Sequence, residues 1–166
     1  MTIEEAIQTA IQYEKAVRDV YAEAAKTVGD PKGRRVCEVL GQEEQTHLDY
    51  LSERLREWRK TGNVQPRALK TAVPSREAIA QAAKSAAGGV SAAERDTEMK
   101  MLGRALEAER KTSAFYRQMV AELSSEGQGL FRHFVEIEEG HVAIVQAEMD
   151  SLTGNGAWFD ILEVKL

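Results

Sequence analysis

Residues 43–47 read EEQTH and residues 137–141 read IEEGH, and these two stretches decide the fold. Each holds a Glu three residues before a His, as Glu44 with His47 and Glu138 with His141. The chain has 3 histidines, so two of the three stand in this arrangement. Residues three apart lie on the same face of a helix. The repeated spacing is therefore typical either of a charged solvent face or of paired metal-ligating groups.

The sequence around both stretches is helical, with clear start and stop signals. Capping residues and glycines predict long helices over 2–28, 30–62, 91–123 and 125–154. The N-terminal signals are Thr2 with Glu5, Asp30 with Pro31, Ser91 with Glu94, and Ser125 with Gln128. Helices of this length can pack side by side as a four-helix bundle.

The connection between the two helix pairs differs in composition from the rest. Pro66 and Pro74 flank an irregular stretch, and SREAIAQAAKSAA predicts a short helix. The connection is long enough to cross the length of the bundle. We therefore expect one all-α domain over 1–166, a four-helix bundle divided into a helix pair 2–62, a crossover 62–90, a helix pair 91–153 and a tail 154–166.

The two helix pairs are similar to each other in sequence. Placing Glu44 on Glu138 also places His47 on His141 and Gly33 on Gly127. Placing Glu14 on Glu109 also places Tyr21 on Tyr116. The offset in this second alignment is one residue longer than in the first. The chain is therefore an internal repeat of a helical hairpin, with too few copies for a solenoid.

Four glutamates of this repeat lie on the apolar faces of their helices. Steps of four and seven residues from Glu44 reach Leu40, Leu48 and Leu51, and the same steps from Glu138 reach Phe134, Val142 and Val145. Glu14 and Glu109 have equivalent surroundings. The glutamates that fall off the apolar stripe, and that we expect on the solvated face, are Glu43, Glu53 and Glu57.

Four carboxylates inside one bundle need a neutralising charge. An isolated buried carboxylate costs several kcal/mol. Arg18 is a candidate partner for Glu14, but one Arg and shared protons would hardly offset four carboxylates. Two divalent cations would balance them, and this ligand set is the one used by di-iron and di-manganese carboxylate bundles. A structural charge cluster is the alternative.

These motifs resemble those of the ferritin-like superfamily, and within it the rubrerythrin-like proteins, over residues 2–153. The resemblance implies a ferritin-like bundle with a dinuclear iron centre. The resemblance implies that Glu14 and Glu109 are terminal ligands and that Glu44 and Glu138 are bridging ligands. It also implies one nitrogen ligand per metal, from His47 and His141. Nitrogen and oxygen ligands also suit Mn(II) or Zn(II).

Two features depart from the rubrerythrin pattern. Rubrerythrins usually carry an extra Glu one turn after the third-helix ligand, and Thr112 stands there, which makes the ligand set more like that of bacterioferritin. Full rubrerythrins also add a rubredoxin domain with four cysteines, whereas this chain has a single cysteine, Cys37. Electrons would then come from a separate donor such as a rubredoxin-like protein.

Several other side chains have two interpretations. Tyr21 and Tyr116 have a catalytic interpretation, in which they donate hydrogen bonds to the ligands or transfer holes. In the other interpretation they are core tyrosines whose hydroxyls need a partner. Cys37 is expected to pack in the core, and His133 to lie at a surface or an interface. The aromatic residues expected in packing or subunit contacts are Trp58, Trp158 and Phe159.

The predicted function is a non-haem di-iron oxidoreductase of ferroxidase or peroxidase type, which oxidises Fe(II) with O2 or H2O2 in oxidative stress or iron handling. The alternatives are iron storage of ferritin type and a metal-free helical interaction module. The net charge of −5 argues against nucleic-acid binding, and no apolar run is long enough for a membrane span. The acidic N-terminus is unlike a signal peptide, and the single cysteine fits a cytoplasmic protein. The family resemblance favours a homodimer.

Overall fold

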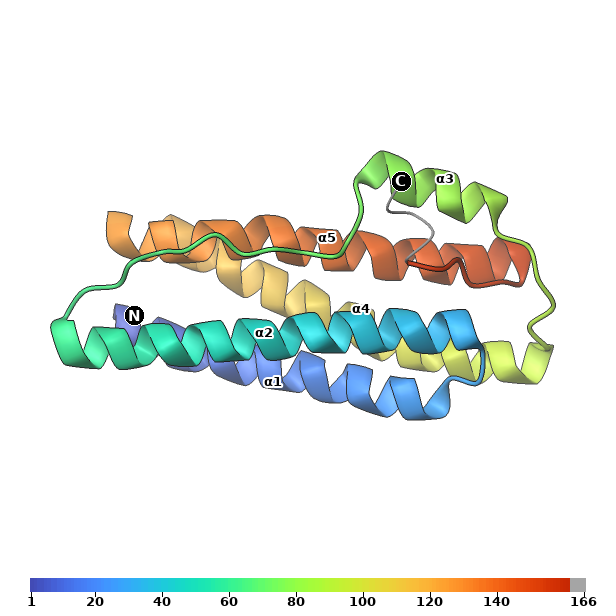
Figure 1. Ribbon diagram of the computed structural model, residues 1–166, viewed down its shortest axis with the longest axis horizontal. Helices are drawn as coiled ribbons and strands as arrows, with labels where there is room; N and C mark the ends of the chain where they lie inside the picture. The colour runs from blue at the N-terminus through green and yellow to red at the C-terminus, as the bar shows by residue number, and fades with distance from the viewer. Residues whose placement is uncertain (162–166) are drawn as a thin grey trace.

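The computed structural model describes residues 1–161, and it is all-helical. Its helices are α1 (Ile3–Thr27), α2 (Pro31–Thr61), α3 (Arg76–Ser85), α4 (Ala92–Glu122) and α5 (Ser125–Asn155). Figure 1 shows the four long helices side by side in a bundle, with the short α3 packed outside α5. Residues 1–161 contain no strand, which confirms the all-α prediction.

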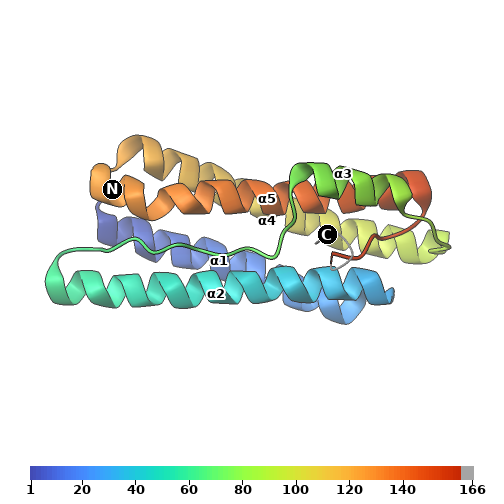
Figure 2. The same ribbon diagram turned by 45° about the horizontal axis from the view of Figure 1, so that its top comes forward.

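The two hairpins are joined by a long connection. After α2 ends, the chain runs back along the bundle between α2 and α5, forms α3, and only then enters α4 (Figures 1 and 2). α2 and α4 consequently begin at the same end of the bundle and run in the same direction. The prediction of a long connection with one short helix is confirmed.

The helix ends follow the capping signals with one exception. Thr2 and Glu5 form a reciprocal capping box, and the Asp30 and Ser91 side chains accept hydrogen bonds from backbone amides in the first turns of α2 and α4. The prediction that Ser125 caps the last helix is wrong. The cap residue is Ser124, and its side chain makes no capping hydrogen bond. This helix therefore begins without the side-chain cap that the prediction assumed.

The last helix also continues past the glycine that was expected to end it. α5 ends at Asn155, and Gly156 adopts the left-handed conformation with φ of 65°. A helix stops most readily where glycine can take a positive φ, and here Gly156 rather than Gly154 does so. Gly62, with φ of 73°, ends α2 in the same way.

The apolar core is divided into two clusters by polar residues at the middle of all four long helices. Along α1, Ile7 and Ala10 belong to one cluster, whereas Val17 and Tyr21 belong to the other. Each of the other three long helices likewise contributes one end to each cluster. Glu14 lies at the division in α1 and is fully buried. The polar centre therefore has apolar packing both above and below it.

The segment after α5 folds back into the bundle. The Trp158 ring lies over Gly33, where an added Cβ would come within 2.4 Å of a ring carbon. Its Nε1 donates a hydrogen bond to Glu98 Oε2 at 2.8 Å, and the neighbouring Phe159 is also buried. The packing interpretation of these two aromatic residues is confirmed. Positions 162–166 of the predicted tail lie outside the described residues.

Candidate metal centre

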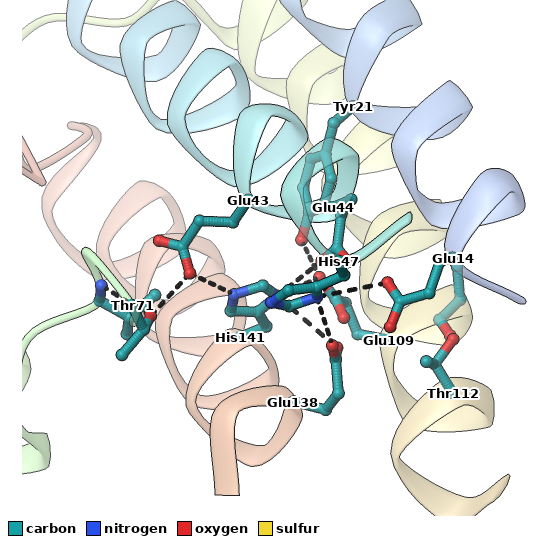
Figure 3. A network of polar contacts seen from close by, with 12 residues as sticks. Glu14, Tyr21, Glu43, Glu44, His47, Thr71, Glu109, Thr112, Glu138 and His141 are labelled. Atoms are coloured by element: carbon teal, nitrogen blue, oxygen red, sulfur yellow. Dashed lines mark hydrogen bonds and ion pairs between the residues drawn. The ribbon is translucent and has the colours of Figure 1, made fainter. Parts of the chain in front are cut away.

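The six predicted ligands come together at the middle of the bundle, where Figure 3 shows them converging from the long helices. They form two groups of four, in each of which one nitrogen or oxygen atom per residue lies within 4.8 Å of the others. The first group is Glu14, Glu44, His47 and Glu138, and the second is Glu44, Glu109, Glu138 and His141. All six side chains are buried. Such a cluster of carboxylate and imidazole groups could hold a metal ion.

Both histidines turn Nδ1 toward the carboxylates. His47 Nδ1 lies 3.2 Å from Glu44 Oε2, and also 3.2 Å from Glu138 Oε1 without the alignment of a hydrogen bond. His141 Nδ1 lies 2.7 Å from Glu44 Oε1 and 3.2 Å from Glu109 Oε1. The two rings are nearly parallel, at 12°, with centroids 5.8 Å apart. The Nδ1 atoms therefore face the space that the carboxylates enclose.

The two tyrosines of the repeat contact the carboxylates reciprocally. Tyr21 on α1 donates a hydrogen bond to Glu109 Oε1 on α4 at 2.5 Å, and Tyr116 on α4 donates one to Glu14 Oε1 on α1 at 2.5 Å. Glu109 Oε1, which accepts from Tyr21, also lies 3.2 Å from His141 Nδ1, whereas the second oxygen of Glu14, Oε2, lies 3.5 Å from His47 Nδ1. The two tyrosines thus act as donors to ligand residues, and a part in hole transfer stays a prediction.

The two glutamates that belong to both groups, Glu44 and Glu138, resist ionisation. Burial raises the pKa of Glu44 to about 8, with the charges of Glu14 and Glu109 adding to the effect. Burial and the neighbouring carboxylates also raise the pKa of Glu138 well above its usual range. The metal-free cluster therefore retains protons at neutral pH that a bound cation would displace.

Glu14 and the two histidines favour their charged forms instead. Burial alone would raise the pKa of Glu14, but hydrogen bonds with Glu44 and His47 lower it to about 2. Burial alone would lower the pKa of each histidine, yet the charge of Glu14 raises that of His47 and the charge of Glu109 raises that of His141, both well above their usual range. Raised histidine pKa values favour imidazolium groups, which balance part of the carboxylate charge in the cluster.

The cluster nevertheless leaves oxygens without partners, which tests whether a cation fits. Glu14 Oε2, Glu109 Oε2 and both oxygens of Glu138 are buried and accept no hydrogen bond within the described part of the chain. Buried polar atoms are normally paired, because an unpaired one costs free energy. Unpaired carboxylate oxygens next to imidazole nitrogens are the donor set that divalent cations such as Fe(II), Mn(II) and Zn(II) accept. The residues present therefore fit a metal centre.

Glu43 is also part of this centre, so its placement on a solvated face is wrong. It is 9 % exposed, and its Oε1 accepts a hydrogen bond from Thr71 Oγ1 at 2.7 Å and lies 3.1 Å from His141 Nε2. Its Oε2 accepts a hydrogen bond from the backbone amide of Ala72 at 2.7 Å. Helical periodicity places Glu43 outside the apolar stripe, but the connection between α2 and α4 covers that flank of α2.

The other predicted contacts divide between core and surface. Arg18 does not pair with Glu14, because its guanidinium contacts Asp19 and Gln45 at the surface. Thr112 is buried beside the centre and donates to the backbone of the preceding turn, so it supplies no carboxylate. Cys37 is buried in the core, where burial raises the pKa of its thiol to about 12.

Comparison of the chain with protein-family models, with curated proteins and with solved structures found no match in any of the three. The resemblance to rubrerythrin-like proteins therefore stays a prediction from the motifs. The metal-binding interpretation rests on the burial, spacing and unpaired oxygens of the cluster itself. No helix within residues 1–161 has the length and apolar character needed to cross a membrane.

Proposed function

We propose that this protein is a ferritin-like, non-haem di-iron oxidoreductase that oxidises Fe(II) with O2 or H2O2. The observation that carries the proposal is that the two ligand groups share Glu44 and Glu138. Shared carboxylates between two groups of donors would hold two cations next to each other. A structural charge cluster does not need donors to be shared in this way.

In this proposal each cation has its own imidazole and its own terminal carboxylate. Glu14 and His47 would hold one metal ion, and Glu109 and His141 would hold the other. Four carboxylates balance two divalent cations. The Tyr21 and Tyr116 hydroxyls fix the two terminal carboxylates, which limits how far those ligands can move.

The protein would supply a dry, ordered pocket for the reaction. Iron held by the six Glu and His side chains would supply the two electrons that, with two protons, reduce H2O2 to two waters. Phe134 lies edge-on to His47 at 5.3 Å and stacks on Tyr116 at 4.6 Å, so aromatic rings close one side of the pocket. Excluding water in this way strengthens the interactions between the ligands and the metal charges.

Anaerobic loading with Fe(II), followed by addition of O2 or H2O2, tests the proposal. We expect two iron ions per chain and a near-ultraviolet band of ferric carboxylate that grows as the oxidant is consumed. Glu138→Gln should lose both signals, whereas the matched control Glu139→Gln, at a surface residue paired with Arg117, should keep them. Loss of neither signal in Glu138→Gln, or of both in Glu139→Gln, contradicts the proposed site.

The same preparation separates the alternative functions. A metal-free interaction module would bind less than one metal ion per chain after careful loading. An iron-storage protein would form a very large particle with many irons per chain, whereas we expect a homodimer by size-exclusion chromatography with mass measurement. The proposal also includes a cytoplasmic location and a separate electron donor, so the oxidised protein should be reduced by a rubredoxin-like protein.

A further inference from the structure

The two halves of the centre differ at the outer nitrogens of the histidines. His141 Nε2 lies 3.1 Å from Glu43 Oε1, whereas His47 Nε2 is buried and has no hydrogen-bond partner within residues 1–161. The internal repeat places Ile137 where Glu43 stands in the first copy. A branched alkyl side chain offers no acceptor, so the second copy has no counterpart of the contact between Glu43 and His141.

Glu43 is held from outside the helical hairpins. Thr71 Oγ1 and the Ala72 amide each donate to it at 2.7 Å, and both belong to the connection between α2 and α4 (Figure 3). With these two donors and the His141 N–H, the carboxylate has three hydrogen bonds. These three bonds fix the orientation of the carboxylate toward His141.

A neutral imidazole carries one proton on its two nitrogens. An acceptor that holds the proton on one nitrogen therefore leaves the other nitrogen with a free lone pair. When Glu43 accepts the proton of His141 Nε2, His141 Nδ1 presents its lone pair to the ligand pocket. Within residues 1–161 no acceptor fixes a proton on His47 Nε2 in the same way. Its ring is positioned by the contact of Nδ1 with Glu44 and by packing edge-on to Phe134, so the outer nitrogen stays unbound.

We propose that Glu43 is a positioning residue that makes the two metal positions unequal, so that the position at Glu109 and His141 binds its cation more tightly and fills first. This inference rests on the proposed two-metal site and adds an order of filling to it. An outer hydrogen bond of this kind typically changes metal affinity about 10–100-fold. The inequality comes from the connection, which exists once, and not from the duplicated hairpins.

Titration of the metal-free full chain with Mn(II), with free Mn(II) followed by electron paramagnetic resonance, tests the inference. We expect two binding events per chain with affinities about 10–100-fold apart. His141→Ala should remove the tighter event and His47→Ala the weaker one. Glu43→Ile, which makes the two copies alike, should weaken the tighter event toward the weaker one, and Glu43→Gln, which keeps an oxygen acceptor, should weaken it less.

Nitrogen-15 spectra of the Zn(II)-loaded protein report on the two histidines separately. The His141 Nε2 proton should exchange slowly with solvent in the parent chain and rapidly in Glu43→Ile, with no change at His47. Two equal Mn(II) affinities in the parent chain, or an equal loss at both positions in Glu43→Ile, would overturn this inference alone. Failure of the parent chain to bind Mn(II) at all would overturn the two-metal site as well.

Discussion

Replacing Glu138 with Leu should stabilise the metal-free protein while it abolishes metal binding. Both oxygens of Glu138 are fully buried and lack hydrogen bonds within the described chain, and burial raises the pKa of this carboxyl. An unsatisfied buried polar group costs about 1–3 kcal/mol, and a leucine of similar size removes it. For a chain of this length that gain raises Tm by about 2–12 °C.

The sign of the change separates a metal centre from a structural charge cluster. Removing one partner of a buried ion pair that exists for stability costs about 3–5 kcal/mol. Chelator-treated parent and Glu138→Leu proteins would be compared by urea and thermal unfolding, with Glu139→Leu as a surface control expected to change stability by no more than about 0.5 kcal/mol. A metal-free Glu138→Leu protein that is less stable than the parent by about 3 kcal/mol or more would refute the reasoning.

Three further changes have defined outcomes. Tyr116→Phe removes the hydroxyl bound to Glu14 and should destabilise the metal-free protein by about 1.5–3 kcal/mol in urea unfolding, whereas Tyr13→Phe, whose hydroxyl has no hydrogen bond in residues 1–161, should not. Glu148 is fully buried, and burial raises the pKa of its carboxyl, so its contribution to stability falls as pH rises above about 4.5. Glu148→Gln should reduce the slope of the free energy of unfolding against pH, measured by unfolding experiments at pH 5–8. Metal affinity should fall as pH is lowered, because binding displaces protons, and isothermal titration in buffers of different ionisation enthalpy should detect that release.

The position of the centre could be predicted because it depends on helical periodicity alone. A residue such as Glu44 shares its helix face with Leu40 and Leu51. That apolar face is buried in a bundle whichever helices pack against it. Glu43 could not be placed in this way, because its burial depends on where an irregular connection crosses α2. The same holds for Gly33, which is needed because Trp158 returns from the end of the chain to cover it.

Glu148 shows a second limit of periodicity. It lies on the inner face of α5, seven residues after His141, and its carboxylate is buried without a hydrogen bond of normal geometry, although the backbone amide of Phe159 lies toward it. Its match in the first copy is Arg54, which is also buried but bonds to Gln65 and Glu57. Two equivalent positions can therefore hold an acidic and a basic residue, because each meets a different non-repeated segment.

Both asymmetries have one physical origin. Duplication of a hairpin supplies two equal sets of ligands, but the two copies must be joined, and the joining segment can cover only one of two equivalent flanks. Here it covers α2 and delivers Thr71 and Ala72 to Glu43, while Ile137 on α5 stays apolar. The difference that we propose between the two metal positions would thus be a consequence of joining the copies in one chain. Thr71→Val, which removes one of the two donors from the connection to Glu43, should therefore lower the tighter Mn(II) affinity without changing the weaker one.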